Sequence, residues 1–238
     1  MNTPASGTSG IVALADALAG STFLGSLSPA HRDRLLTRAQ RRRIKRGEVL
    51  FRRGDAGLSL FAMLSGLIKI AADSVDGREI VLNIMGPGDV FGEIAVLDGQ
   101  PRTADAIALE DSELLAIQRV DMLALLDRDA AFARRLIEIL CERVRWVSDQ
   151  YEDAQFLDLG HRLAKKLVYL ASAFGRPDGA RVRIDLKLSQ GELGRMVGVS
   201  RESVNKQLRI WQDRGIVDVD GGTIRIDRAA LEAEGKAP

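Results

Sequence analysis

Residues 188–217 read LSQGELGRMVGVSRESVNKQLRIWQDRGIV and contain two helical stretches joined at Gly198. Two helices that cross at a short turn need apolar side chains between them, a small residue at the crossing and a glycine at the turn. These requirements match Leu193, Val197, Val199 and Val204 for packing, Gly194 for the crossing and Gly198 for the turn. Gln207 departs from the apolar pattern, and we expect Leu208 beside it to fill that space. The stretch therefore predicts a helix-turn-helix.

The segments on either side of this motif extend it to a winged helix. HRLAKKLVYLASAFG, at residues 161–175, reads as an amphipathic helix that ends at Gly175 and Pro177, and a β-like RVRIDLKL follows at residues 181–188. After the second helix, VDVDGGTIRID at residues 217–227 reads as a hairpin with Gly-Gly at its turn. The order of helix, two-helix motif and hairpin is that of a winged helix-turn-helix.

The second helix of the motif carries the side chains that we expect to read DNA. Ser200 can cap it, and its first two turns present Arg201, Glu202, Ser203, Asn205 and Lys206. Arg can bond guanine at two places and Glu can accept from the cytosine amine, so Arg201 and Glu202 are the expected specificity residues. The alternative is a solvated helix start, because capping also favours Ser-x-Glu. Phosphate contacts are expected from Ser189, Gln190, Arg209, Thr223 and Arg225.

The charge distribution agrees with a nucleic-acid partner for the C-terminal part. Net charge is +1, but residues 159–238 hold 15 Lys and Arg against 10 Asp and Glu, whereas residues 1–158 hold 19 against 23. A basic C-terminal segment on an acidic remainder favours DNA binding there, and a merely basic surface is the alternative.

Residues 129–158 read as one long helix, because neither Gly nor Pro interrupts them. Apolar residues recur in alternating steps of four and three, at Ala133, Ile137, Leu140, Val144, Val147, Tyr151 and Ala154. This heptad seam is typical of a two-stranded coiled coil, so we expect a homodimer with an interface of Ile137, Leu140, Val144, Val147 and Tyr151. The alternative is a helix packed on its own domain, for which Leu136 and Ile139 are suited.

The N-terminal half is predominantly β. From Lys45 to Gln118, short apolar runs alternate with glycines, which favours a small antiparallel barrel or sandwich, and Asp76 and Gly77 suit a hairpin turn. SPAHRDRLLTRAQ, from Ser28, reads as a short helix with a Ser cap and Pro at its first position. Residues 1–20 are expected to be a flexible segment, in which residues 11–18 could form a short helix.

The residue inventory argues against several other functions. His31 and His161 are the only histidines and neither has a metal-ligand partner at a recognisable spacing, so we expect no metal site. Cys141 is the only cysteine, which rules out an internal disulfide. No apolar run approaches the roughly 18 residues of a membrane span, and no secretory signal is recognisable, so we expect a cytoplasmic protein without membrane contact. No catalytic motif is recognisable, and we do not expect an enzyme.

Three stretches together resemble the cyclic-AMP receptor protein branch of the Crp/Fnr transcription regulators. They are PGDVFGEIAVLDGQPRTADA at residues 87–106, QFLDLGHRLAKKLVYLA at 155–171 and VGVSRESV at 197–204. The resemblance implies an α+β chain with four parts: the N-terminal segment 1–20, a double-stranded β-helix (jelly-roll or β-roll) domain at 21–128 that binds a cyclic nucleotide, a dimerisation helix at 129–158 and a winged helix-turn-helix at 159–238. It also implies a two-fold symmetric DNA site and RNA polymerase as a partner.

The resemblance places a cyclic phosphate and its ribose between Glu93 and Arg102. The implied ligand residues are Gly92, Glu93, Ile94, Arg102, Thr103, Ala104, Arg143, Val147 and Ser148. An Arg fork can meet a phosphate diester with two bonds, and a carboxylate accepts from the ribose hydroxyl, so Glu93 is expected to hold the sugar and to orient Arg102. A plain ion pair between Glu93 and Arg102 that closes a loop is the alternative.

The base end of the implied site departs from the family. Members that respond to cyclic AMP carry a Thr-Ser pair on the long helix, and Val147 with Ser148 stands here. Cyclic AMP is our first expectation for the effector; cyclic GMP, a cyclic dinucleotide or no ligand at all are the alternatives. Neither an iron-sulfur cluster nor haem is expected, because Cys141 is alone and neither histidine matches the family's haem ligand. On the long helix, Cys141 is expected to be a buried structural thiol.

Overall fold

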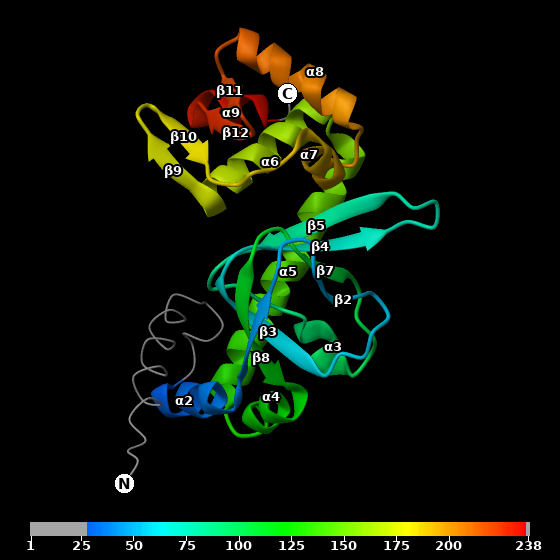
Figure 1. Ribbon diagram of the computed structural model, residues 1–238, viewed down its shortest axis with the longest axis vertical. Helices are drawn as coiled ribbons and strands as arrows, with labels where there is room; N and C mark the ends of the chain where they lie inside the picture. Colours follow the sequence, from blue (N-terminus) through cyan, green and yellow to red (C-terminus); the bar gives the residue numbers. More distant parts are fainter. Residues whose placement is uncertain (1–27, 237–238) are drawn as a thin grey trace. The chain divides into compact units, whose positions relative to one another are not determined.

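The computed structural model describes residues 28–236, which form two compact units that meet within one helix. The first unit ends at Arg143 and the second begins at Val144 (Figure 1). The expected N-terminal segment 1–20, with its short helix at 11–18, lies outside the described residues. No helix in the described range is both long and apolar enough to cross a bilayer.

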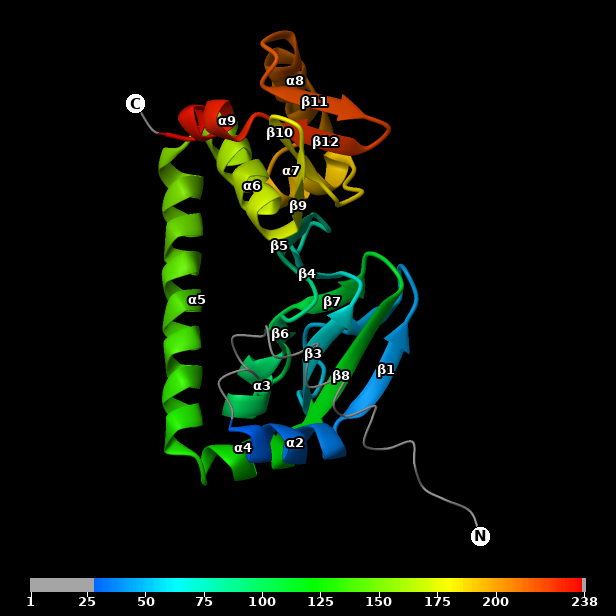
Figure 2. The same cartoon turned by 90° about the vertical axis from the view of Figure 1, so that its left-hand side faces the viewer.

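The first unit is a two-sheet β-roll with helices on its outside (Figures 1 and 2). One sheet has the strand order β1-β8-β3-β6 and the other β2-β7-β4-β5, with antiparallel pairing throughout. The elements are α2 (Pro29–Arg38), β1 (Gln40–Ile44), β2 (Val49–Phe51), β3 (Ser59–Ser65), β4 (Ile68–Asp73), β5 (Glu79–Met85), β6 (Val90–Phe91), α3 (Glu93–Asp98), β7 (Asp105–Ala108), β8 (Ser112–Gln118), α4 (Arg119–Leu126) and α5 (Ala130–Phe156).

Strand β3 shows how the first unit packs, because both of its faces are buried. Side chains alternate between the two faces of a strand. Phe61 and Met63 point into the core between the sheets, whereas Leu60 and Ala62 pack against the helical layer. This is why SLFAMLS reads as a continuous apolar run and not as an alternating one.

Two local predictions in this unit are confirmed and two elements were not anticipated. Helix α2 begins at Pro29, and the hydroxyl of Ser28 accepts from a backbone amide of its first turn. The β4–β5 hairpin turns through Gly77, which has φ of +77°. The short helices α3 and α4 have no clear periodic signal in the sequence.

The long helix α5 runs for 27 residues and uses its faces for different purposes. Phe132 and Leu136 are buried in the first unit, and Ile139 packs against the same cluster. Most of the heptad seam turns elsewhere, since Ile137, Val144, Val147 and Tyr151 are each more than half exposed. Leu140 is the exception, because it is half-buried and packs against the first unit. Packing on the chain's own domain and an exposed seam therefore coexist in one helix.

The second unit is a winged helix-turn-helix with a four-stranded sheet of order β11-β12-β10-β9. Its elements after α5 are α6 (Leu159–Phe174), β9 (Gly175–Asp178), β10 (Arg181–Ile184), α7 (Gln190–Val197), α8 (Arg201–Asp213), β11 (Val217–Asp220), β12 (Thr223–Ile226) and α9 (Arg228–Glu234). The predicted α+β class, with β-roll, long helix and winged helix-turn-helix, is confirmed. The expected strand 181–188 is shorter, ending at Ile184, and β9 and α9 were not anticipated.

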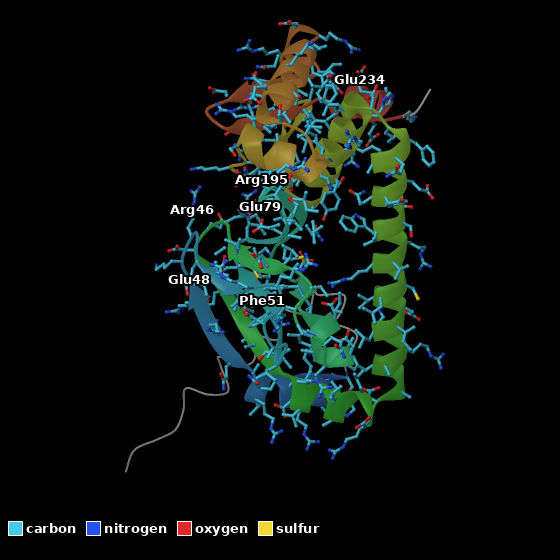
Figure 3. The ribbon with its side chains drawn as sticks, turned by 90° about the vertical axis from the view of Figure 1, so that its right-hand side faces the viewer. Arg46, Glu48, Phe51, Glu79, Arg195 and Glu234 are labelled. Atoms are coloured by element: carbon cyan, nitrogen blue, oxygen red, sulfur yellow. The ribbon has the colours of Figure 1, made fainter. Side chains whose placement is uncertain are left out.

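Helix α9 is fixed to the end of α8 by polar contacts. Glu234, labelled in Figure 3, accepts from the indole nitrogen of Trp211 at 3.1 Å and from both terminal nitrogens of Arg214 at 3.0 and 2.6 Å. These bonds hold the pKa of the Glu234 carboxyl below its usual range, with Arg214 as the main cause. Asp227 caps α9, and Leu231 is fully buried.

Candidate functional site

The cassette at residues 91–106 is built around a glycine in the left-handed conformation. Gly92 has φ of +79° and joins β6 to α3. A β-carbon at this position would stand 2.6 Å from Nη1 of Arg102, which is closer than real contacts allow. The backbone angle at Gly92 therefore favours glycine, and a side chain there would displace the guanidinium group of Arg102.

Arg102 is a buried cation, with only 5% of its surface exposed. Its Nη1 donates to the carbonyl of Gly92 at 2.8 Å and its Nη2 to the carbonyl of Ser59 at 2.5 Å. Its guanidinium carbon lies 4.2 Å from the ring centroid of Phe51, which is labelled in Figure 3. Burial lowers the pKa of Arg102, while Glu93 and Asp55 act in the opposite direction. The two groups that accept hydrogen bonds from Arg102, the carbonyls of Gly92 and Ser59, are neutral. The binding of an anion beside Arg102 would therefore be strongly favoured.

Three aromatic rings form the floor beneath Arg102. Phe51, Phe61 and Phe91 have centroid separations between 5.6 and 6.2 Å, and two of the three pairs are stacked. They come from β2, β3 and β6, which belong to both sheets. Phe51 and Phe61 hold the guanidinium by cation–π contact, and Phe91 packs against both of these rings.

Glu93 is equally buried, at 3% exposure, and is paired with Arg143 of α5. Oε1 of Glu93 accepts from Nη1 of Arg143, whose Nη2 donates to the carbonyl of Val90 at 2.5 Å. Oε2 of Glu93 has no hydrogen-bond partner within the described chain. The alternative of a plain loop-closing ion pair between Glu93 and Arg102 is therefore wrong, whereas the orienting role of Glu93 stays a prediction, with Glu93 acting on Arg102 through its charge. The carboxylate instead ties the cassette to α5 and keeps one oxygen for a further donor.

The remaining cassette residues line the same segment with different exposure. Thr103 and Ile94 are exposed, Ala104 is buried, and Gly92 is half-buried. Asp89, which sequence reasoning missed, accepts from the amide of Gly86 at 2.8 Å. Asp89 is exposed as a whole residue, but desolvation of its carboxyl raises the pKa of that group, against the effects of Gly86 and Arg143. The signal available for Asp89 was its place in the quoted PGDVFGE run.

The two expected base-contacting residues lie on α5 in the second unit. Val147 is 57% exposed and brings an apolar surface. Ser148 is exposed, and its hydroxyl donates to the carbonyl of Val144 one turn earlier at 3.0 Å. An oxygen that donates in this way can still accept a hydrogen bond from a ligand.

The turn between α7 and α8 has the close packing that a helix-turn-helix requires. A β-carbon on Gly194 would stand 2.6 Å from the carbonyl oxygen of Val199, and Gly198 has φ of +73°. Leu193, Val204 and Leu208 are buried between the helices. Leu208 fills the apolar core as expected, and Gln207 is only half-buried beside it.

The start of α8 presents the expected DNA-reading side chains. The hydroxyl of Ser200 accepts from the amide of Ser203 at 3.2 Å, and a full capping box of Ser189 and Glu192 begins α7. Of the predicted set, Ser189, Ser200, Arg201, Glu202, Lys206 and Arg209 are exposed, and Gln190, Ser203 and Asn205 are half-buried. The pKa of Glu202 is lowered, first by its backbone amide and then by the Ser200 hydroxyl.

The wing holds its basic residue in ion pairs. Arg225 of β12 contacts Asp178 at 2.9 Å and Asp218 at 3.3 Å, which raises its pKa. Thr223, at the start of the same strand, is half-buried. A phosphate contact from Arg225 would therefore have to compete with two carboxylates.

The single cysteine differs from its prediction, because Cys141 is exposed. Successive residues on a helix are about 100° apart, so Cys141 points away from the face on which Leu136 and Leu140 meet the first unit. Both histidines pair with carboxylates: Nδ1 of His31 lies 2.6 Å from Asp129, and Nδ1 of His161 lies 2.7 Å from Asp158. Within residues 28–236, no three His, Cys, Asp or Glu side chains form a group that could hold a metal ion.

Comparisons with known families match both units. Residues 41–129 match the cyclic nucleotide-binding domain, and residues 161–234 match the Crp-like helix-turn-helix domain. The chain is 34% identical over 181 residues to a CRP-like cAMP-activated global transcriptional regulator of Mycobacterium tuberculosis, covering 76% of this chain and 81% of that protein. It is 33% identical over 215 residues to the cyclic AMP receptor protein of Thermus thermophilus, covering 90% and 96%.

A solved structure with a different effector in its description is also similar. The c-di-GMP responsive global regulator CLP of Xanthomonas campestris is 27% identical, with a TM-score of 0.69 and coverage of 84% of this chain and 99% of that one. The first matched domain falls on the β-roll, and the second falls on the winged helix-turn-helix. The chain therefore belongs to the Crp/Fnr family of transcription regulators, in which a cyclic nucleotide-binding domain precedes a DNA-binding helix-turn-helix.

Proposed function

We propose that the protein is a homodimeric transcription regulator gated by cyclic AMP. The observation that carries this proposal is the pair of buried charges in the β-roll, Arg102 and Glu93, each with a polar atom that has no partner in the described chain. A cyclic nucleotide offers one anion and one hydroxyl, which are the groups that such a pair lacks.

The ligand's phosphate and ribose would take separate partners. Arg102 binds the phosphate, assisted by the hydroxyl of Thr103 and by amides at the start of α3, which no side chain caps. The free Oε2 of Glu93 accepts from the ribose 2′-hydroxyl. Gly92, Ile94 and Ala104 shape the segment, and Arg143 links it to α5 through Glu93.

The base would meet Val147 and Ser148 of α5, and this is where the choice of effector is made. Ser148 can bond a purine, whereas Val147 lacks the hydroxyl found in family members that respond to cyclic AMP. The loss of one such bond costs about 1 kcal/mol. Cyclic GMP, a cyclic dinucleotide or no ligand are the alternatives, and the effector named for the Xanthomonas regulator supports keeping the dinucleotide among them.

The exposed seam of α5 supports the homodimer. Four apolar side chains at heptad spacing, Ile137, Val144, Val147 and Tyr151, lie in water in a single chain, and pairing with a second copy would bury them together with Leu140. A dimer places two recognition helices on a palindromic DNA site with half-sites one turn apart. Arg201 and Glu202 would read the bases, with Ser203, Asn205 and Lys206 beside them, and Ser189, Gln190, Ser200 and Arg209 would contact phosphates. RNA polymerase is the proposed protein partner.

Titration calorimetry of the purified protein with cyclic AMP and with cyclic GMP tests the effector. We expect cyclic AMP to bind with the higher affinity, and Arg102→Ala to weaken it by at least about 100-fold, because a charge-assisted pair with phosphate is lost. Arg78→Ala, on the exposed β4–β5 turn, is the matched control and should bind as the wild type does. Absence of heat with both nucleotides would refute cyclic-AMP gating.

A further inference from the structure

Lys166 of α6 places its ammonium group among side chains of two helices. Nζ lies 5.6 Å from the ring centroid of Trp146 and 5.4 Å from that of Tyr169, and it donates to Oε1 of Gln150 at 3.1 Å. Trp146 and Gln150 belong to α5, whereas Tyr169 follows Lys166 on α6. One ammonium group therefore connects the C-terminal half of α5 to α6, and all four residues belong to the second unit.

A second lysine supports the same joint. Lys165 bonds Asp153 of α5 at 2.5 Å, so two adjacent residues of α6 contact α5. Only Leu157 and Asp158 separate the two helices, and Asp158 caps α6. The angle between α5 and α6 is thus fixed over a very short connection, with side-chain contacts from both helices.

The surroundings of Lys166 make its contacts stronger than those of a surface lysine. Burial lowers the pKa of Lys166, and Asp153 acts against this effect. Asp153 itself is bonded to Lys165, whereas the Lys166 ammonium contacts two aromatic rings and an amide oxygen. Cation–π contacts are worth more when the cation has lost its water. A different angle between the helices would leave this ammonium group poorly solvated and without these partners.

Helix α6 also contacts the helix-turn-helix motif directly. Nη1 of Arg162, one turn before Lys166, donates at 3.0 Å to the carbonyl of Val197, which directly precedes the turn at Gly198. Contacts therefore run from Trp146 on α5 through α6 to the turn between α7 and α8.

We propose that Lys166 is a positioning residue that holds the helix-turn-helix at a fixed angle on the dimer helix, so that ligand-induced changes in α5 reach α8. This inference rests on the proposed gating by a cyclic nucleotide. It assigns to Lys166 a role in coupling, and none in contact with nucleotide or DNA.

The test compares Lys166→Met with Lys166→Arg and with Lys45→Met, which removes an exposed ion-paired lysine of the first unit. Operator affinity is measured, with and without saturating cyclic AMP, on the tightest duplex that the wild type selects from a random library. We expect Lys166→Met to bind cyclic AMP within about 2-fold of wild type, but to reduce the ligand's effect on operator affinity by about 5-fold or more. Lys166→Arg should retain most of the effect, because guanidinium also stacks on aromatic rings, and Lys45→Met all of it.

A double-mutant cycle and a readout that needs no ligand complete the test. Trp146→Leu should reproduce the loss, and adding Lys166→Met to it should change little further. Amide hydrogen exchange in residues 146–170 should be faster in Lys166→Met and unchanged in Lys45→Met. If wild type binds neither nucleotide, the gating proposal fails while the exchange comparison still decides the role of Lys166. The inference would be overturned if Lys166→Met had the same amide exchange rates and the same effect of cyclic AMP on operator affinity as the wild type. It would also be overturned if Lys45→Met lost as much of that effect as Lys166→Met.

Discussion

Arg102 and Glu93 are the residues on which the β-roll's chemistry depends, because each is a charge held out of water. Burying an ionised group is costly unless hydrogen bonds and opposite charges compensate. Here carbonyls and aromatic rings partly satisfy Arg102, and Arg143 partly satisfies Glu93. Among residues 28–143, Arg102 and Glu93 are the buried charged side chains, and this concentrated cost is why we propose them as partners of a ligand.

The role proposed for Glu93 predicts how strongly binding depends on the ribose 2′-hydroxyl. Wild type should bind 2′-deoxy cyclic AMP about 10-fold or more weakly than cyclic AMP, since a hydrogen bond to a carboxylate is lost. In Glu93→Gln the difference between the two nucleotides should shrink, because the charged acceptor is gone. Competition binding with both nucleotides measures this. An unchanged preference in Glu93→Gln would show that another group reads the hydroxyl.

Sequence reasoning reached the charged pair but not its surroundings. Gly92, Glu93 and Arg102 lie within one short stretch whose spacing is informative. Phe51 and Ser59, which hold Arg102, come from β2 and β3, and only the pairing of distant strands brings them there. The ion pair of Glu93 with Arg143 was not predicted for the same reason: Arg143 is 50 residues away, and its approach depends on how α5 packs on the first unit.

At the scale of elements, the local sequence pattern predicted the regular helices. It did not predict elements that form only because they pair with another strand. Helix α5 and the α7–α8 motif were predicted because their apolar spacing and their glycines are local. Strand β9, with the sequence GRPD, has no alternating pattern and contains Pro177; it is a strand because it pairs with β10. Likewise, the local sequence did not predict that Arg225, the expected phosphate contact, bonds Asp178, which lies 47 residues earlier.

The α7–α8 crossing gives a prediction for stability. Gly194→Ala should destabilise the second unit by about 1–3 kcal/mol, because the new methyl group would overlap the backbone carbonyl of Val199. Gly191→Ala, on the same helix, is the matched control: its β-carbon would meet nothing closer than 3.7 Å, so stability should stay the same or rise by up to about 1 kcal/mol. Thermal unfolding of both variants measures the difference, and equal melting temperatures would contradict the steric argument.

The exposed seam of α5 gives a prediction for assembly. Val144→Glu should shift the protein to monomers, because two carboxylates would face each other at one heptad position. Ala131→Glu introduces the same charge at an exposed position on the same helix, outside the seam, and should leave the dimer intact. Sedimentation equilibrium distinguishes the two variants. A dimer that survives Val144→Glu would place the interface elsewhere.

At the scale of the whole molecule, the two units share helix α5. We therefore expect ligand binding to one unit to change the affinity of the other unit for its own ligand. Coupling between two binding sites is reciprocal: if cyclic AMP tightens operator binding by some factor, operator DNA must tighten cyclic AMP binding by the same factor. Calorimetry with and without saturating operator duplex should therefore give the ratio found in DNA-binding assays, in a typical range of about 5- to 150-fold. If the affinity for cyclic AMP were the same with and without operator DNA, gating through α5 would be excluded.

The exposed thiol of Cys141 also makes this protein convenient for spectroscopy. It is the only cysteine in the sequence, and it sits on the helix that carries the seam. A probe attached there needs no prior removal of other thiols, and in a symmetric dimer it yields a single probe-to-probe separation. That one distance, followed during addition of nucleotide or DNA, would report directly on how the paired helices rearrange.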